Sequence, residues 1–261
     1  MNILEKIVVD KRKEVQLKSS LVPISQFEKS VLFNSNCRSL AAALKSSKTG
    51  IIAEHKRRSP SKKTINQDVN VAQVAKGYQN AGACGMSVLT DIKYFGGSLE
   101  DLLLARASVE MPLLRKEFVI DEYQILEAKA YGADVILLIA AILTRQEIKN
   151  LSELAKSLGM DVLLEVHNQV ELEKSIMPSL DMLGVNNRNL KTFEVSLDIS
   201  KELSKLIPDQ FVKVSESGIS SIEAIKELKD YGYEGFLIGE NFMKTKNPGK
   251  SASEFIKKLA Q

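Results

Sequence analysis

The chain has 261 residues, a formal net charge of +3 and an apolar share of 44%. It is long enough for one large α/β domain or two small ones, and its composition argues against disorder. The small net charge, with acids and bases interspersed, leaves no electrostatic footprint for nucleic acid. No apolar run approaches membrane-spanning length and the first residues lack the apolar core of a signal peptide, so we expect a cytoplasmic protein with neither a nucleic-acid nor a membrane partner.

Residues 1–48 are expected to form a charged helical extension. An apolar stripe at helical spacing opens this segment, a dense run of charged residues at 10–14 lies behind the stripe, and a second helical piece covers about residues 39–45. The stripe consists of Ile3, Leu4, Ile7 and Val8.

After Gly50, short apolar runs alternate with amphipathic segments. The eight predicted strands are Ile51–His55, Gly85–Thr90, Pro112–Lys116, Val135–Ile139, Val162–Val166, Met182–Asn186, Phe211–Ser215 and Gly235–Ile238. The predicted helices are Val69–Ala81, Leu99–Ala107, Glu122–Tyr131, Arg145–Leu158, Gln169–Ser175, Leu197–Leu206, Ser220–Tyr231 and a last one near Ala252–Leu259.

Strands that alternate with helices predict parallel pairing through right-handed crossovers. Eight such units favour an α/β protein with a single (β/α)8 TIM barrel over residues 49–261, preceded by the extension. An open doubly wound sheet is the alternative. The chain, however, has no Gly-x-Gly-x-x-Gly after its first strand and no Walker loop.

The first predicted strand continues into a polar turn closed by Ser-Pro-Ser at 59–61. Because side chains alternate along a strand, Glu54 and Lys56 are expected on one face and His55 on the other. Opposite charges on one face of a buried strand are costly unless they are paired or used in chemistry. A structural ion pair and a functional one both fit this segment.

Polar residues also follow four later strands. In a TIM barrel the carboxyl ends of the strands meet at one mouth, where catalysis takes place. Two lysines, three carboxylates and an amide are therefore expected there: Glu54, Lys56, Lys116, Glu165, Asn186 and Glu216. A solvated face explains any one of them, but it explains poorly that each stands at or just past the end of an apolar run.

The last two strands each end in a turn that contains a glycine. Loops at these two places in a barrel commonly bind phosphate through backbone N–H groups. Gly218 and Gly239 permit the close approach of backbone that a phosphate oxygen requires, although glycine also ends strands for packing reasons. The pair indicates a phosphorylated small molecule.

Several ordered segments resemble the indole-3-glycerol phosphate synthase family of tryptophan biosynthesis, over nearly the whole chain. They are Ile-Ala-Glu-His-Lys-Arg-Arg-Ser-Pro-Ser (52–61), Leu-Thr-Asp (89–91), Tyr-Phe-Gly-Gly-Ser (94–98), Pro-Leu-Leu-Arg-Lys-Glu-Phe (112–118), Leu-Glu-Val-His (164–167), Leu-Gly-Val-Asn-Asn-Arg-Asn-Leu (183–190) and Ser-Glu-Ser-Gly-Ile (215–219). Departures from the family pattern are His55, Lys63, Glu117 and Asn241-Phe242, which affect loop geometry and substrate affinity rather than the reaction.

The resemblance implies a carboxy-lyase that closes the indole ring of 1-(2-carboxyphenylamino)-1-deoxyribulose 5-phosphate with loss of carbon dioxide and water. It makes Lys116 the general acid and Glu165 its partner in proton transfer. Lys56, held by Glu54, would pair with the substrate carboxylate or share the acid role. Asn186 and Glu216 would orient the substrate hydroxyls and the intermediate.

For the rest of the substrate, the resemblance implies that phosphate lies against Ser59, Ser217, Gly218 and the Gly239-Glu240 turn. Arg188 is a further cation for the mouth or only a loop residue. Phe95 is a candidate for stacking on the anthranilate ring, with loop packing as the alternative.

We expect neither a metal nor a cofactor. The two histidines, His55 and His167, lack a third ligand, and Cys37 and Cys84 have no metal-ligand spacing and are interpreted as packing residues. The chain is expected to act as a monomer.

The extension over residues 1–48 is expected to cover the mouth as a lid, or alternatively to serve as a plug that aids solubility. Two rival functions remain open: another phosphosugar barrel such as phosphoribosylanthranilate isomerase, usually run by a Cys/Asp or Asp/Asp pair, and a non-catalytic sugar-phosphate sensor.

Overall fold

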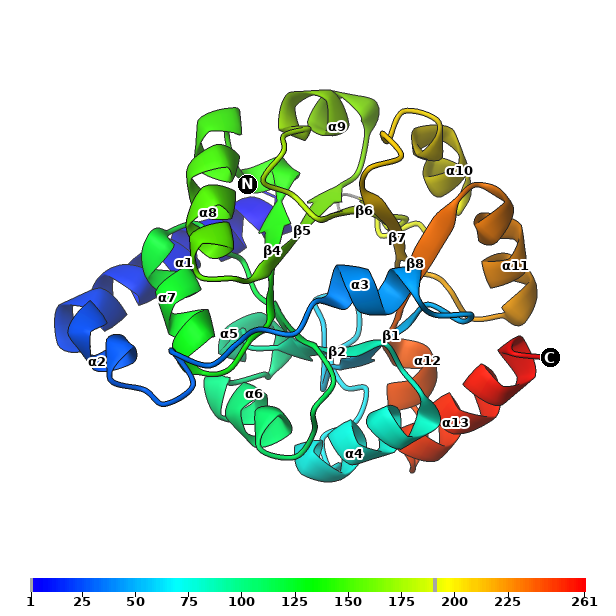
Figure 1. The fold of residues 1–261 in the computed structure, drawn as a ribbon, viewed down its shortest axis with the longest axis horizontal. Helices are drawn as coiled ribbons and strands as arrows, with labels where there is room; N and C mark the ends of the chain where they lie inside the picture. The colour runs from blue at the N-terminus through cyan, green and yellow to red at the C-terminus, as the bar shows by residue number, and fades with distance from the viewer. Residues whose placement is uncertain (1, 190–191) are drawn as a thin grey trace.

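The computed structural model describes residues 2–189 and 192–261, and these residues form a closed barrel of eight parallel strands in chain order (Figure 1). The strands are β1 (Ile51–His55), β2 (Gly85–Leu89), β3 (Leu113–Lys116), β4 (Val135–Ile139), β5 (Asp161–Val166), β6 (Met182–Asn186), β7 (Val212–Glu216) and β8 (Tyr233–Ile238). The barrel closes where Ile52 of β1 pairs with Leu237 of β8. The predicted (β/α)8 barrel is confirmed.

Helices surround the barrel and follow each strand in turn (Figure 1). They are α4 (Val71–Ala81), α5 (Ile92–Phe95), α6 (Leu99–Arg106), α7 (Glu122–Ala130), α8 (Arg145–Ser157), α9 (Gln169–Ser175), α10 (Asp198–Ser204), α11 (Ile222–Asp230), α12 (Glu240–Met243) and α13 (Pro248–Leu259), with a 3-10 turn at Ala140–Ile142. Most begin at a side chain that accepts a hydrogen bond from the first turn, as Asn70 does for α4 and Ser221 for α11.

The barrel has two apolar layers because successive strand residues face opposite sides. Ile51 and Ala53 of β1 belong to the outer layer, which packs against the helices. Ile52 belongs to the inner layer together with Leu137, Leu163 and other inward-facing residues. Glu54 follows Ile52 on the inner side, so the alternation brings its carboxylate toward the interior at the carboxyl end of β1.

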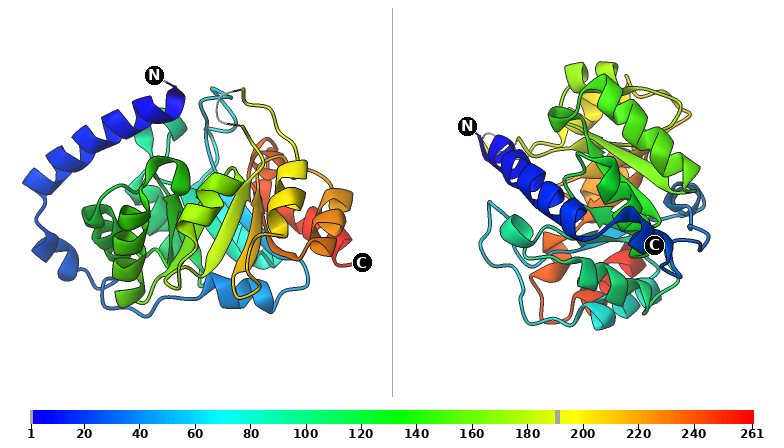
Figure 2. Two further views of the ribbon diagram at one scale, coloured as in Figure 1. Left: turned by 90° about the horizontal axis from the view of Figure 1, so that it is seen from above. Right: turned by 90° about the vertical axis from the view of Figure 1, so that its left-hand side faces the viewer.

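The N-terminal segment reaches both ends of the barrel (Figure 2). Helix α1 (Ile3–Leu21) begins outside the carboxyl ends of the strands, where Ile7 packs on the inner layer, and leads to the short α2 (Ile24–Glu28), which lies at the side of the barrel against α7 (Figure 2). Helix α3 (Leu40–Lys45) lies across the opposite end and inserts Leu40 and Leu44 into the same inner layer. Side chains from one extension therefore close the interior from both directions.

Candidate active site

A cavity of 390 Å³ opens at the carboxyl ends of the strands. All thirteen residues that the sequence singles out for catalysis or substrate binding line it: Glu54, Lys56, Ser59, Phe95, Lys116, Glu165, Asn186, Arg188, Glu216, Ser217, Gly218, Gly239 and Glu240. The barrel brings them together because each stands at a strand end or in the loop that follows. The lining also includes Leu4 of the stripe expected to cover the mouth, and residues for which the sequence predicted no role, among them Phe118 and Phe193.

At the centre of the mouth, one ammonium group lies between two carboxylates from other strands. Lys116 Nζ forms an ion pair with Glu216 Oε2 and lies 3.5 Å from Glu165 Oε2. Burial would lower the pKa of Lys116, but the surrounding carboxylates of Glu216, Glu165 and Glu54 raise it above its ordinary value. Lys116 is therefore protonated at neutral pH, as a general acid must be.

The carboxylates around Lys116 differ in their protonation. Burial raises the pKa of Glu216 to about 7, assisted by the like charges of Glu165 and Glu54 and opposed by Lys116. Burial also acts on Glu165, but there Lys116, His167 and Asn186 outweigh it, and the pKa lies below the ordinary value. Two neighbouring carboxyl groups whose pKa values are driven apart are typical of sites that carry out acid and base steps.

Glu165 is fixed by three neighbours. Besides Lys116, Asn186 donates a hydrogen bond from Nδ2 to Glu165 Oε1 over 3.1 Å, and His167 Nε2 lies 3.3 Å from the same oxygen. His167 in turn lies 3.1 Å from Glu171 through Nδ1. Burial would lower the pKa of His167, but the hydrogen bond with Glu171 and the charges of both glutamates raise it. From its sequence, His167 was weighed only as a metal ligand, so its contact with Glu165 was not predicted.

The second lysine of the mouth is paired within its own strand end. Lys56 Nζ lies 2.5 Å from Glu54 Oε1, which matches the predicted placement of both side chains on one face. His55 is buried on the other face and does not line the cavity, and burial is the main cause that lowers its pKa to about 4. A Cβ atom at position 239 would lie 2.4 Å from Glu54 Oε1, so Gly239 leaves the room that this carboxylate occupies.

Gly184 of β6 makes similar room for Glu216, because a Cβ atom there would lie 2.5 Å from Glu216 Oε1. We expect Gly184→Ala to displace Glu216 from Lys116 and to lower kcat roughly tenfold or more, the scale of about 1.4 kcal/mol. Steady-state kinetics of the purified variant measures this. Shortening the displaced side chain, in Gly184→Ala combined with Glu216→Asp, should recover part of the loss; a Gly184→Ala variant with wild-type kcat would contradict the steric role.

The loops after β7 and β8, which the sequence predicts to bind phosphate, form one side of the mouth. Ser217 and Gly218 both have left-handed backbone, with φ of 69° and 74°. A Cβ atom at position 218 would lie 2.2 Å from Val195 Cγ1, so this position requires glycine for space as well as for conformation. After β8, α12 begins at Gly239 without a side-chain cap. The first N–H groups of such a helix have no acceptor within it and are free for an anion.

The remaining binding candidates lie around this rim. The guanidinium of Arg188 donates to the backbone oxygen of Phe193 over 3.1 Å, which fixes its own loop. Lys62 lies 2.7 Å from the Glu240 carboxylate and joins the loop after β1 to the start of α12 after β8, the neighbouring strand of the closed barrel. Ser59 Oγ lies 3.2 Å from Ser61 Oγ, and both serines line the cavity. Leu190, the last residue of one matching segment, lies outside the described residues.

An aromatic wall closes one side of the mouth. The rings of Phe95 and Phe118 lie 5.9 Å apart between centroids and are tilted by 43°. Phe118 stands two residues after Lys116, so strand alternation predicts that both face the mouth. Phe118 was nevertheless not among the predicted site residues. Ile3, Leu4 and Ile7 of α1 complete the apolar lining.

Comparison with known protein families gives a match over nearly the whole chain. The sequence profile described as Indole-3-glycerol phosphate synthase matches residues 4–255. The chain belongs to this family. It is therefore a lyase of tryptophan biosynthesis, as the resemblance implied.

Relatives named indole-3-glycerol phosphate synthase match over nearly their full length. One from Bacteroides thetaiotaomicron is 46% identical over 99% of both chains, and one from Polaromonas naphthalenivorans is 42% identical over 98% of both chains. Among solved structures, the KGPDC of Streptococcus mutans superposes with a TM-score of 0.61, covering 80% of this chain and 98% of that one. Its 14% sequence identity shows a shared fold alone.

Across residues 2–189 and 192–261, no group of three or more His, Cys, Asp or Glu side chains is placed to bind a metal ion. In the same ranges, no helix has both the length and the apolar character that a membrane span needs.

Proposed function

We propose that the mouth of this barrel closes the indole ring of 1-(2-carboxyphenylamino)-1-deoxyribulose 5-phosphate, with Lys116 as the general acid and Glu165 as its partner in proton transfer. The observation that supports these roles most directly is the position of the Lys116 ammonium, which lies within 3.5 Å of Glu165 and is paired with Glu216. Three buried carboxylates keep this lysine charged at the point where a ketone oxygen must be protonated.

In the proposed reaction, the ring carbon that bears the carboxylate attacks the ketone carbon. The C=O electron pair accepts a proton from Lys116 and becomes a hydroxyl. The C–CO2 bond then breaks, carbon dioxide leaves, and its electron pair restores the ring. Loss of the hydroxyl as water, with one proton given to the leaving oxygen and one removed from carbon, forms the indole. Because its pKa lies below the ordinary value, Glu165 is ionised at neutral pH and is in the form that can accept this proton.

The two ends of the substrate have separate places in this proposal. The loop with left-handed Ser217 and Gly218 and the uncapped start of α12 would bind phosphate, with Ser59 and Arg188 nearby. The aromatic wall would stack on the anthranilate ring, and Lys56 would pair with its carboxylate. Asn186 would orient Glu165 and the substrate hydroxyls.

The proposal extends to the N-terminal helix, the oligomeric state and the cellular location. Helix α1 would act as a lid, since Ile3, Leu4 and Ile7 line the cavity and exclude water from it. The chain would act as a monomer, since residues of one chain line the whole mouth. The net charge of +3 and the tryptophan-pathway reaction suit a cytoplasmic enzyme that needs no cofactor.

The decisive experiment is to mix the purified chain with the carboxyphenylamino-deoxyribulose phosphate and follow indole fluorescence. We expect fluorescence to rise with time and enzyme concentration. Conversion of phosphoribosylanthranilate instead would favour the isomerase alternative, and binding of substrate without any turnover would favour the sensor.

Ser217→Asp tests the phosphate site. Aspartate tolerates the left-handed backbone of this position, so the main change is a negative charge that repels phosphate. We expect KM to rise by about tenfold or more, as repulsion of roughly 1.4 kcal/mol requires, with a smaller change in kcat. Ser217→Asn is the matched neutral control and should change KM far less. Equal KM values for the two variants would place the phosphate elsewhere.

A further inference from the structure

A lysine of α1 is buried where the helix crosses the barrel. Lys11 is only 2% exposed and lies one helical turn from Ile7 and from Val15, which are also buried. A buried ammonium group is costly unless carboxylates pair with it. Apolar packing therefore does not explain why a lysine occupies the buried face of this helix.

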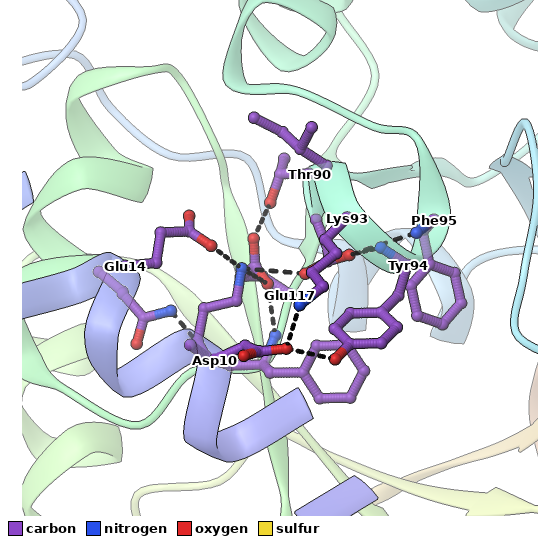
Figure 3. Close-up of polar contacts among 12 residues, drawn as sticks. Asp10, Glu14, Thr90, Lys93, Tyr94, Phe95 and Glu117 are labelled. Atoms are coloured by element: carbon purple, nitrogen blue, oxygen red, sulfur yellow. Dashed lines mark hydrogen bonds and ion pairs between the residues drawn. The ribbon is translucent and has the colours of Figure 1, made fainter. Parts of the chain in front are cut away.

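Lys11 bridges three elements through its one ammonium group. Its Nζ lies 3.0 Å from Glu117 Oε1 at the end of β3, 3.1 Å from Asp91 Oδ2 after β2 and 2.8 Å from Glu14 Oε2 on its own helix. Burial would lower the pKa of Lys11, but these carboxylates raise it, so the group stays charged. Figure 3 shows Glu14 and Glu117 directed toward this common point, with Thr90 beside them.

Asp91, the partner of Lys11 that follows β2, fixes the Phe95 half of the aromatic wall. Asp91 is the N-cap of α5 and accepts hydrogen bonds at Oδ1 from the backbone of Tyr94 over 2.6 Å and of Phe95 over 3.2 Å. Its other oxygen, Oδ2, pairs with Lys11. The Asp91 carboxylate thus connects α1 to the backbone of Phe95, whose ring lines the mouth.

Glu117, the partner of Lys11 that follows β3, fixes the Phe118 half of the aromatic wall. Glu117 stands between Lys116 and Phe118, and all three residues line the cavity. It accepts a hydrogen bond at Oε1 from the backbone of Phe118 over 2.9 Å and one at Oε2 from the hydroxyl of Thr90 over 2.8 Å. Lys11 and the Phe118 backbone therefore share one oxygen of this buried carboxylate.

A second, exposed contact repeats the connection nearer to solvent. Asp10 lies 2.6 Å from Lys93 Nζ and accepts a hydrogen bond from the hydroxyl of Tyr94 (Figure 3). Both partners belong to α5, so α1 contacts this short helix on two sides. An exposed pair of this kind adds little by itself, whereas loss of a buried partner leaves an uncompensated charge.

We propose that Lys11 is a positioning residue, which makes the placement of the aromatic wall formed by Phe95 and Phe118 depend on docking of the N-terminal helix. This assignment rests on the proposed function, in which that wall receives the anthranilate ring. Lys11 itself does not line the cavity, so its effect on the substrate passes through Asp91 and Glu117.

Lys11→Met tests the proposal, because methionine keeps an unbranched side chain and removes the charge. We expect faster amide hydrogen exchange in α1, in residues 91–95 and at residues 117–118, with unchanged exchange in β5 to β8. The matched control is Lys18→Met on the same helix. Lys18 pairs with Glu14 and Glu127 at 3.2 and 3.4 Å but touches neither wall segment, and its variant should leave residues 91–95 and 117–118 unchanged.

Kinetics supply the readout that a purely structural role would not change. We expect Lys11→Met to raise KM by about tenfold or more, with a smaller change in kcat, because the wall contributes to binding rather than to proton transfer. Lys11→Arg, which keeps the charge, should recover most of the affinity. Wild-type exchange at residues 91–95, or a KM within twofold of wild type, would overturn the proposal.

Two further measurements keep the test decisive. If Lys11→Met does not fold, Lys11→Gln removes the charge but keeps a donor for one of the buried carboxylates, and it should speed exchange at residues 91–95 and raise KM by a smaller factor. Unchanged exchange there would count against the proposal. The exchange experiment needs no substrate, so failure of the wild-type chain to form indole would refute the proposed function separately.

Discussion

Replacement of Lys116 by methionine should lower kcat for indole formation by about two or more orders of magnitude, the usual contribution of a general acid. The ammonium group that would protonate the ketone is then absent, and no other lysine pairs with both Glu165 and Glu216 among the residues that the structure describes. Indole fluorescence under saturating substrate measures the effect. Unchanged turnover in this variant would eliminate Lys116 as the acid.

The stability of the same variant should depend on pH in a defined direction. Burial would raise the pKa of Glu165, but Lys116 is the main cause that lowers it below its ordinary value, so this pair stabilises the fold above the unfolded carboxyl pKa, and the contribution is lost as the pH falls. Without the Lys116 cation, burial is less opposed and the pKa of Glu165 rises, so its charged carboxylate destabilises the fold as the pH rises. The deficit in the free energy of unfolding should therefore be larger at about pH 8 than at about pH 5, where the buried carboxyls take up protons. A deficit that is independent of pH would mean that the carboxylates do not depend on Lys116.

Glu165→Gln should have the second large effect, a loss in kcat of about 10² to 10⁴. Glutamine keeps the shape of the side chain and its hydrogen bond with Asn186, but it can neither accept nor return a proton. KM should change far less than kcat, because the substitution alters chemistry more than contact. Single-turnover kinetics separates the two.

Glu171→Gln is the matched control for that experiment. Glu171 contacts the same histidine, His167, but does not line the cavity. We expect its variant to keep kcat within a few-fold of wild type. If the two variants lost activity equally, the effect would arise from His167 and its surroundings rather than from proton transfer by Glu165.

The strands and the polar mouth could be predicted from the sequence because both depend on local patterns. An apolar run closed by a charged residue, as in the segment that ends at Lys116, identifies a buried strand and also marks the end where catalysis takes place. Strands β1, β4 and β6 have the predicted bounds, and the bounds of the other five differ from the predicted ones by one or two residues. In β7 the difference brings Glu216 into the strand, one residue beyond the predicted end.

The features that were missed depend on contacts distant in sequence. Helices α5 and α12 have four residues each and no apolar period, and α5 exists because Asp91 caps it. Lys11 was assigned to the charged run behind the apolar stripe, although its spacing from Ile7 and Val15 places it on the buried face. Its burial is understood only once Asp91 and Glu117 lie opposite it, and no local pattern predicts that.

The packing of α3 across the amino ends of the strands has a consequence for folding during synthesis. Residues 40–45 leave the ribosome before any strand exists, yet Leu40 and Leu44 belong to one apolar cluster with Val212 and Val214 of β7. This cluster cannot be completed until β7 has been synthesised, and until then the two leucines remain partly exposed to water or covered by a chaperone, because contacts between residues distant in sequence form late. Truncated nascent chains that stop before β7 should consequently expose Leu40 and Leu44, which are buried in the complete protein, as an aggregation-prone apolar pair.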